Sequence, residues 1–393
     1  MTTALRRAAA AAAALLALPL AVTAAAPAPA APAVPLPLPV SASTAVPADV
    51  HLQLPRPTGP YAVGREILHL VDRGRPDPWV PSAGPRQLMV SMHYPAERGT
   101  GGAAPYMTPA AARLLLDDKL PEFGVPTEAL AGARTWARTG AQPLQRRFPL
   151  LVLSPGFTMP RTELTNLAED LTSRGYVVAL IDHTYENTGT TFPDGRTLTC
   201  ILCDTLTPDS DWAGIVANRA KDASFVVDQL TTRPRYAHLV DRDRIGMAGH
   251  SSGGAATVPA LLTDSRIRAG VDLDGSLDHQ VPVTGLKGKP FMVIGNSADG
   301  QEDPSWTAGW PRVDGWKRWL TVAGSDHSTF TDYALFFEQL GLPPRPGATI
   351  DAARGLRLTR QYVAAFFDLH LKGVPQPILD GPTPQNPEIT FHP

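Results

Sequence analysis

Short apolar runs recur along most of the chain, and polar or helix-patterned segments separate each run from the next. The run at 148–154 is almost wholly apolar, which is typical of a strand that is covered on both faces. Strands that alternate with helices predict an α/β fold, in which a mostly parallel central sheet carries helices on both faces. We predict strands at 66–72, 87–94, 148–154, 176–181, 245–248, 267–274, 290–295 and 317–322, and long helices at 161–173, 212–230 and 351–371.

The connection between the second and third predicted strands is unusually long. Its residues 109–146 contain helical stretches around 110–120 and 127–138. Connections of this length are uncommon unless they pack as structure or serve a function. We therefore expect a helical insertion before the third strand, either as a lid or as helices that cover the sheet.

Residues 1–26 have the composition of a secretory signal peptide. Arg6 and Arg7 precede an apolar run at 8–20, and small residues follow it. An uncleaved membrane anchor is disfavoured, because the run is rich in Ala and Pro19 breaks it. The sequence therefore predicts an exported, extracellular protein.

The remaining boundaries follow from composition. Residues 27–60 are rich in Ala and Pro and lack helical or strand periodicity, which predicts an extended leader. The regular alternation of strands and helices places the α/β domain at 61–380, and residues 381–393 are expected to form a C-terminal tail.

Charge and cysteine content exclude several classes of function. The chain has 393 residues and a formal net charge of −2, so it has no basic footprint for nucleic acid. Its two cysteines are Cys200 and Cys203, and no further ligands occur near them at metal-binding spacing. In an exported protein this pair favours a local disulfide over free thiols. We expect neither a metal nor a cofactor.

The segment Gly249-His-Ser251-Ser252-Gly253 lies between a predicted strand and a helix of small residues. Gly-x-Ser-x-Gly at such a turn is the nucleophile elbow of the α/β-hydrolase fold. The glycines let strand and helix pass closely at a strained turn. This context predicts that Ser251 is a nucleophile.

A serine hydroxyl needs a base, and the base needs an orienting carboxylate. In this fold the order along the chain is Ser, then Asp or Glu, then His. His327 follows the last predicted strand directly, where a loop can reach the elbow. Three other histidines follow Ser251. His279 comes before the last two predicted strands, His370 lies inside the last predicted helix, and His392 is next to the chain end.

Two acids follow the strands after the elbow and fit the position of the orienting carboxylate. Asp274 ends one strand and Asp299 follows the next, so spacing alone leaves the choice open. Asp272 alternates with Asp274 and is expected to be a hydrogen-bonded acid behind the site.

An oxyanion in this chemistry needs two preorganised N–H donors. Ser252, directly after the nucleophile, is expected to supply one donor. Phe157, in the loop after the third strand, is expected to supply the other, because Gly156 lets that backbone bend towards the substrate. His183 also ends a strand, and we interpret it as a structural loop histidine.

From about residue 55 to residue 371 the chain resembles α/β-hydrolases of the platelet-activating-factor acetylhydrolase type (plasma and type II group). The resemblance implies that Ser251 is the nucleophile, His327 the base and Asp274 the acid, and so favours Asp274 over Asp299. In that family His often stands where this chain has Pro155. The shared pieces are LVLSPGF at 151–157, DRIGMAGHSSGG at 243–254, GVDLDG at 270–275 and GSDHSTFTD at 324–332.

A second resemblance is to bacterial cutinases and polyester hydrolases. It rests on SPGFT at 154–158 and IGNSAD at 294–299, and it implies Asp299 as the acid. Those enzymes lack the Asp-Leu-Asp-Gly segment and usually carry Met where this chain has Ser252. A non-catalytic secreted binding module is the alternative of another class, but such modules commonly lose a member of the triad.

The resemblance implies a secreted, metal-independent serine esterase that forms an acyl-enzyme. The expected substrates are small-molecule or lipid esters, with short acyl groups or phospholipid acetyl groups foremost and transient contact with a lipid surface. Cutinase-like hydrolysis of longer lipids or polyesters is the enzymatic alternative.

Overall fold

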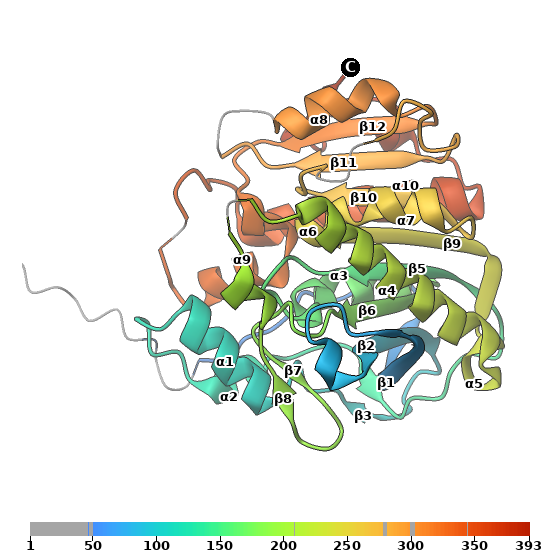
Figure 1. The fold of residues 1–393 in the computed structure, drawn as a ribbon. Helices are drawn as coiled ribbons and strands as arrows, with labels where there is room; N and C mark the ends of the chain where they lie inside the picture. The colour runs from blue at the N-terminus through green and yellow to red at the C-terminus, as the bar shows by residue number, and fades with distance from the viewer. Residues whose placement is uncertain (1–45, 47–49, 208, 278–280, 299–302, 344) are drawn as a thin grey trace, which may run out of the picture. The chain divides into compact units, whose positions relative to one another are not determined.

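The computed structural model describes residues 46, 50–207, 209–277, 281–298, 303–343 and 345–393. All of them belong to one compact unit, Thr44–Pro393 (Figure 1). The predicted signal peptide at 1–26 and the first part of the predicted leader lie outside the described residues. Within the described ranges, none of the helices combines the length and the apolar character that a membrane span requires.

The strands are β1 (Ala62–Pro76), β2 (Pro85–Ala96), β3 (Gly102–Ala103), β4 (Arg138–Thr139), β5 (Phe148–Ser154), β6 (Val177–Asp182), β7 (Thr190–Thr191), β8 (Thr197–Leu198), β9 (Val240–His250), β10 (Ile267–Leu273), β11 (Phe291–Gly295), β12 (Lys317–Val322) and β13 (Ile389–His392). In the described residues the central sheet has the order β13-β12-β11-β10-β9-β5-β6-β2-β1-β4-β3. The central strands β6, β5, β9, β10, β11 and β12 are parallel to one another. The strand β2 runs antiparallel to both β6 and β1, and β13 runs antiparallel to β12. The predicted α/β-hydrolase fold with a mostly parallel sheet is therefore confirmed.

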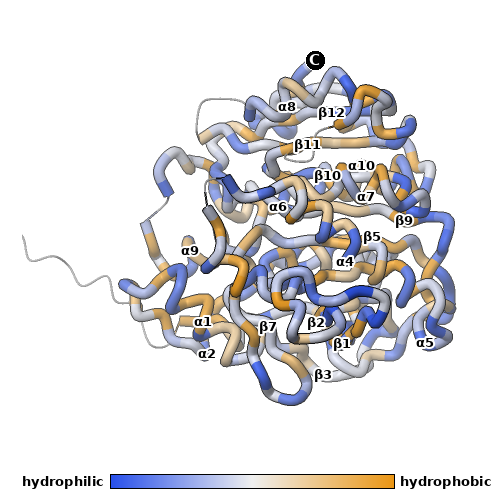
Figure 2. Tube along the Cα trace, in the orientation of Figure 1, coloured by the Kyte–Doolittle hydropathy of each residue, from blue (hydrophilic) through white to orange (hydrophobic). Residues whose placement is uncertain are grey.

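The helices are α1 (Pro109–Lys119), α2 (Thr127–Ala131), α3 (Thr165–Ser173), α4 (Trp212–Thr232), α5 (Pro234–Ala237), α6 (Ser252–Ala255), α7 (Thr257–Thr263), α8 (Pro304–Gly309), α9 (Asp332–Gln339) and α10 (Ala352–Lys372). Short 3-10 helices lie at η1 (Pro81–Ala83), η2 (Arg161–Leu164), η3 (Leu202–Thr205), η4 (Trp310–Arg312), η5 (His327–Phe330) and η6 (Pro377–Leu379). A hydrophobic core lies on each face of the sheet. The helices α4 and α7 pack in one core, and α3 and α10 pack in the other. The strands between these layers are largely apolar (Figure 2).

The two longest helices show why the predicted segments fold as they do. Asp211 caps α4, because its side chain accepts the N–H of Gly214, and Asp351 caps α10 in the same way. Gly373 ends α10 in the left-handed conformation, with φ of 69°. The helix α10 buries the aromatic rings of Phe366 and Phe367 against the sheet.

The register of the central strands brings their carboxyl ends to one edge. Ser154 of β5 pairs with Gly249 of β9. Leu273 of β10 pairs with His250 on one side and with Ile294 on the other. The loops that follow these strands therefore meet at the same edge, where ligands bind in open α/β sheets.

Both ends of the predicted domain extend further than composition indicated. Residues 389–392, within the predicted tail, form the edge strand β13 beside β12. At the other end, Leu52 and Leu54 of the predicted leader are buried, and the N–H of Leu54 donates to the carbonyl of Arg134 at 2.9 Å. These short segments lack a full period of their own and become ordered by contacts with distant residues.

The predicted insertion at 109–146 contains α1, α2 and the short strand β4. Its apolar side chains join a third hydrophobic core, which also includes Leu52 and Leu54 and the residues Tyr333, Phe336 and Leu340 in and directly after α9. We refer to residues 50–54, 106–136 and 332–342 together as the third core. It stands apart from the two cores that cover the sheet.

Candidate active site

Ser251 lies at the sharp turn between β9 and α6. Its backbone has φ of 54° and ψ of −127°, a strained conformation for a residue with a side chain. A Cβ atom on Gly249 would lie 2.2 Å from the carbonyl carbon of Gly253, and one on Gly253 would lie 2.0 Å from the carbonyl oxygen of Ser154. Glycine at these two positions is therefore required for the turn.

His327 begins the 3-10 helix η5, and its ring points to the loop after β10. Its Nδ1 lies 2.5 Å from Oδ2 of Asp274. The Asp274 side chain is only 4% exposed, whereas that of His327 is 47% exposed. The imidazole is thus held by a buried carboxylate while its other edge remains open to a substrate.

Asp274 is fixed by Asn296 as well as by His327. The backbone N–H of Asn296 donates to Oδ1 at 2.8 Å, and its side-chain amide donates to Oδ2 at 2.7 Å. Burial alone would raise the pKa of Asp274, but the hydrogen bonds from His327 and Asn296 outweigh it and hold the pKa below its ordinary value. The carboxylate therefore stays ionised beside His327.

The structure brings Asp274 to His327, and the alternative acid, Asp299, lies outside the described residues. Asp272 is buried behind the elbow, and its Oδ1 accepts the N–H of Gly275 at 2.8 Å. Asp272 therefore has the position that was expected of an acid behind the site.

Ser251 and His327 line the same cavity. Across the described ranges, no hydrogen bond joins the Ser251 hydroxyl to the imidazole. In enzymes without substrate this contact is often long and tightens only when the substrate binds.

The expected oxyanion donors lie on the two sides of the elbow. In the part of the chain that the structure describes, the N–H groups of Phe157 and Ser252 have no intramolecular acceptor. Thr158, the next residue in the loop after β5, has φ of 68°, and its N–H donates to the carbonyl of Glu186 at 2.9 Å. We call Ser154–Thr158 the β5 loop.

An apolar cavity of about 230 Å³ opens beside Ser251. One wall comes from the β5 loop and the η5 segment, and the other comes from the third core. Lys119 and Arg345 add positive charge to this lining. The apolar members from the third core are Leu52, Leu115, Leu116, Leu120, Val125, Leu130, Tyr333, Phe336, Phe337 and Leu340.

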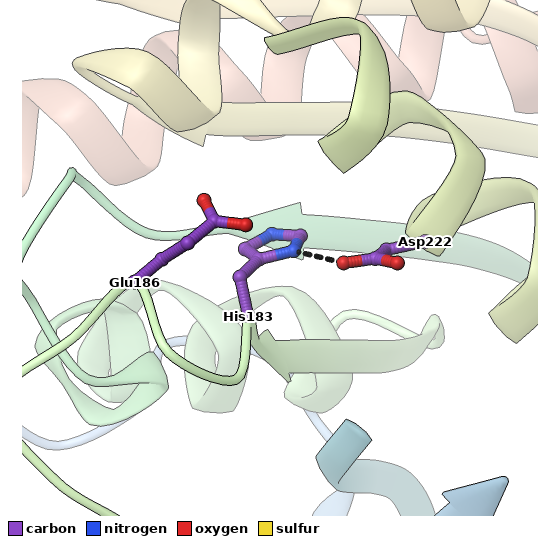
Figure 3. A group of neighbouring side chains, drawn as sticks. All are labelled: His183, Glu186 and Asp222. Carbon is purple, nitrogen blue, oxygen red and sulfur yellow. Dashed lines mark hydrogen bonds and ion pairs between the residues drawn. The ribbon is translucent and has the colours of Figure 1, made fainter. Parts of the chain in front are cut away.

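Behind the β5 loop lies a buried cluster that contains His183, Glu186 and Asp222 (Figure 3). These residue types can bind a metal, but guanidinium groups already contact both carboxylates. Arg86 lies 2.8 Å from Asp222, and Arg219 lies 2.7 Å from Glu186. The cluster is therefore an ion-pair network.

The network fixes the β5 loop from behind. His183 Nδ1 lies 2.8 Å from Asp222, so its Nε2 is the acceptor for the hydroxyl of Ser154 at 2.9 Å. Arg219 donates to the carbonyl of Pro155 at 2.6 Å. Burial, with the charge of Arg219, lowers the pKa of His183, so this ring is neutral.

The cysteines lie outside this cluster, in the segment after the small hairpin of β7 and β8. Cys200 and Cys203 form a disulfide, with their Cα atoms 5.3 Å apart.

Comparison with known proteins places the chain in a family. The family model of platelet-activating factor acetylhydrolase, isoform II, matches residues 214–373. A probable 1-alkyl-2-acetylglycerophosphocholine esterase of Arthroderma benhamiae is 30% identical, over 86% of this chain and 93% of that protein. The chain belongs to the platelet-activating factor acetylhydrolase family. The chain is also similar to the solved structure of a ferulic acid esterase from Streptomyces cinnamoneus, with 44% identity and a TM-score of 0.79. The similarity covers 86% of this chain and 99% of the esterase chain.

A weaker relative outside the acetylhydrolases corresponds to the second resemblance in the sequence. A bis(hydroxyethyl) terephthalate hydrolase of Streptomyces coelicolor is 29% identical over 39% of this chain and 40% of its own length. All three relatives are named as enzymes that act on esters. As a family member the chain is a hydrolase of carboxylic esters, and this predicted enzyme class is confirmed.

Three residues at the site of this acetylhydrolase-family chain were not predicted from the sequence, namely Asn296, His250 and Glu163. Asn296 follows directly after β11, and its position at the sheet edge was the available signal. His250 was read only as part of the elbow motif, although it precedes Ser251. Glu163 carried no local signal, because its role depends on a contact with His250 across the fold.

Proposed function

We propose that this chain releases short acyl groups, acetyl foremost, from esters whose remaining part is apolar, including 1-alkyl-2-acetylglycerophospholipids. One observation carries the proposal. The strained Ser251 and the His327–Asp274 pair border the same apolar cavity. The names of the relatives from Arthroderma benhamiae and from the dog, a platelet-activating factor acetylhydrolase 26% identical over 57% of each chain, support the acetyl group.

In the proposed mechanism Ser251 Oγ attacks the ester carbonyl, and His327 Nε2 takes the hydroxyl proton. Asp274 accepts the Nδ1–H of His327, which fixes the tautomer that leaves Nε2 free to act as a base. The alcohol leaves with the proton from His327, and an acyl-enzyme remains on Ser251. Water, activated by His327 in turn, releases the acid.

The negative oxygen that forms in each step is proposed to accept the N–H groups of Phe157 and Ser252. The lack of an intramolecular acceptor for either group within the described residues supports this role. Fixed donors of this kind stabilise charge without reorganisation during the reaction. The proposed chemistry uses residues of this chain alone.

Secretion is part of the proposal. The Arg6-Arg7 pair with its apolar run supports export, and so does the disulfide between Cys200 and Cys203. Mass spectrometry of the protein from the culture medium tests it, and we expect a mature N-terminus near residue 26. An intact Met1 in the medium would contradict cleavage.

A second candidate is the hydrolysis of feruloyl esters. The 44% identity with the ferulic acid esterase favours it, because that similarity spans nearly the whole of that chain. The cavity also presents the aromatic rings of Phe157, Tyr333 and Phe336. A planar aromatic acyl group suits such a lining.

A substrate panel separates these candidates. We would compare p-nitrophenyl acetate, butyrate and octanoate, 1-hexadecyl-2-acetyl-glycerophosphocholine, and methyl ferulate, with the Ser251→Ala variant as the control. The highest kcat/KM on the acetyl ester of the glycerophospholipid would support the proposal, and the highest value on methyl ferulate would support the second candidate. Wild-type protein that neither hydrolyses an ester nor reacts with a fluorophosphonate would overturn both.

A further inference from the structure

A second pair of a histidine and a carboxylate lies beside the proposed catalytic residues. His250 directly precedes Ser251, and Glu163 lies in η2, shortly after the β5 loop. Nδ1 of His250 is 3.3 Å from Oε1 of Glu163, and Nε2 is 2.8 Å from the carbonyl oxygen of His327. Both side chains are buried.

The partners of His250 determine where protons must lie. A carbonyl oxygen only accepts hydrogen bonds, so Nε2 of His250 carries a hydrogen and donates it to His327. Nδ1 then faces Glu163 in one of two ways. Either Nδ1 is also protonated and donates to a carboxylate, or Glu163 is protonated and donates to Nδ1. In both cases one proton lies between the two side chains, because a bare nitrogen lone pair would repel a carboxylate.

The same carboxylate reaches the β5 loop. Oε1 of Glu163 accepts the N–H of Gly156 at 2.5 Å, and Gly156 precedes Phe157, one of the proposed oxyanion donors. A Cβ atom on Gly156 would lie 3.2 Å from Nδ1 of His250 and 3.4 Å from Oε1 of Glu163. The loop therefore passes directly over the pair, and glycine permits this close approach.

We infer that Glu163 and His250 share one proton and act as a positioning pair, which holds the Phe157 N–H and the His327 loop in place around Ser251. The inference rests on the roles proposed above for Phe157 and His327. Neither member of the pair is assigned a chemical step. Their contacts run through the backbone of His327 and of Gly156, which directly precedes Phe157.

The charges around the pair favour a protonated His250. Burial opposes a charge on His250, but the carboxylates of Glu163 and Asp274 and the hydrogen bond to His327 outweigh it and raise its pKa above the ordinary value. Asp332 and Tyr333 face Glu163 from α9, and burial raises the pKa of both. Among the residues that the structure describes, no arginine or lysine hydrogen-bonds to Glu163.

The substitution Glu163→Gln tests the pair because it keeps the shape and removes the shared proton. If the amide oxygen accepts the N–H of Gly156, it cannot donate to His250. If the amide group turns to donate to His250, its NH₂ faces the N–H of Gly156. We expect kcat on p-nitrophenyl acetate to fall roughly 10-fold to 100-fold with little change in KM. A shift of about 1 Å in the Phe157 N–H or in His327 is enough for a loss of this order.

The pH profile adds a readout that packing alone would not move. Wild-type activity should decline at alkaline pH, as the pair loses its proton, and the Glu163→Gln variant should lack this decline. Glu169→Gln is the matched control, because Glu169 is also a buried acid that accepts backbone N–H groups, those of Trp136 and Ala137, away from Ser251. Equal losses of kcat in both variants would overturn the inference.

Nitrogen NMR on ¹⁵N-histidine-labelled protein tests the pair independently of catalysis, with His250→Asn used to assign the signals. We expect the pKa of His250 to lie above its ordinary value in the wild type, and we expect a neutral Nε2–H ring in Glu163→Gln at neutral pH. The same titration of His250 in both proteins would overturn the inference. Fluorophosphonate labelling of Ser251 reports separately on the proposed function, so the two failures are distinguishable.

Discussion

His183 and His250 both lie at the carboxyl end of a strand beside the β5 loop, and each ring faces a buried carboxylate. Their surroundings differ in charge. Asp222, the partner of His183, also contacts Arg86 and Arg75, which outweigh its burial and hold its pKa well below the ordinary value. His183 can therefore stay neutral.

Glu163 has no such arginine within the described residues, so the proton that satisfies its pair must come from His250 or stay on Glu163 itself. Two pairs of the same residue types thus behave differently because of the cations around them. The pair with arginines is a permanent ion-pair network. The pair without them depends on pH and lies directly against the proposed catalytic residues.

A third pair of a histidine and a carboxylate, His327–Asp274, should show the largest loss of kcat when its carboxylate is removed. Asp274→Asn removes the charge that orients the imidazole, so we expect kcat on p-nitrophenyl acetate to fall on the order of 10⁴-fold, as in other triads. Asp299→Asn is the parallel variant and should keep its activity. A collapse of kcat in Asp299→Asn alone would instead move the acid to the position that the cutinase-like resemblance implied.

Asp222→Asn tests the arginine-rich side. The variant leaves Arg86 buried without its main counter-charge, and we expect a loss of roughly 3–5 kcal/mol in the free energy of unfolding. Urea denaturation measures this loss. The folded fraction should keep most of its kcat, whereas Glu163→Gln should lose kcat with a smaller loss of stability. A large loss of kcat in Asp222→Asn together with a large loss of stability in Glu163→Gln would contradict the difference between the two pairs.

The pH dependence of stability separates the pairs further. The pKa of His250 is raised on folding, so its contribution is complete below the unfolded value of about 6.5 and is lost as the pH rises through the folded value. The pKa of Asp274 is lowered, so its contribution is present above the unfolded value of about 3.9 and is lost as the pH falls through the folded value.

Urea unfolding of the wild type and Glu163→Gln at several pH values on both sides of about 6.5 measures the first effect. The stability that His250 contributes should decline with pH in the wild type. In Glu163→Gln the stability that His250 contributes should instead rise with pH below about 6.5, because burial without the carboxylate lowers the pKa of His250. Identical slopes in the two proteins would show that Glu163 does not hold the proton.

The smallest expected effect concerns the cavity. Leu52→Ala removes apolar surface from the cavity wall, and we expect kcat/KM on p-nitrophenyl octanoate to fall roughly 10-fold. The value on the acetate should change less, because an acetyl group does not extend along the wall. Leu356→Ala, in α10 away from the cavity, is the control for loss of buried volume. Equal effects on both esters would exclude Leu52 from substrate contact.

The sequence predicted the fold and the enzyme class because those depend on local signals. Apolar runs marked the central strands, and Gly249 and Gly253 marked a turn that only glycine permits. The places of Asp274 and Asp299 after strands left both open as the partner of His327, and only the family resemblance favoured Asp274. The catalytic roles of Asp274 and His327 stay predictions.

Other features could not be predicted because they depend on contacts between distant segments. Glu163 and His250 are 87 residues apart, and neither side chain shows in sequence that the other will face it. Leu52 and Leu54 were assigned to a Pro-rich leader, because their backbone hydrogen bonds are with Arg134, which is distant in sequence. The strand β13 likewise exists only because β12 offers it an edge.

The composition of the third core has a kinetic consequence. Gln53 exchanges two hydrogen bonds of 2.9 Å with Gln339, across a separation of 286 residues. Contacts that close such long loops form late in folding, after local ones. The third core should therefore assemble after the sheet, and it should open first in hydrogen exchange, as a cooperative unit of lower stability. The substrate cavity would then be the last part of the molecule to form and the first to be lost.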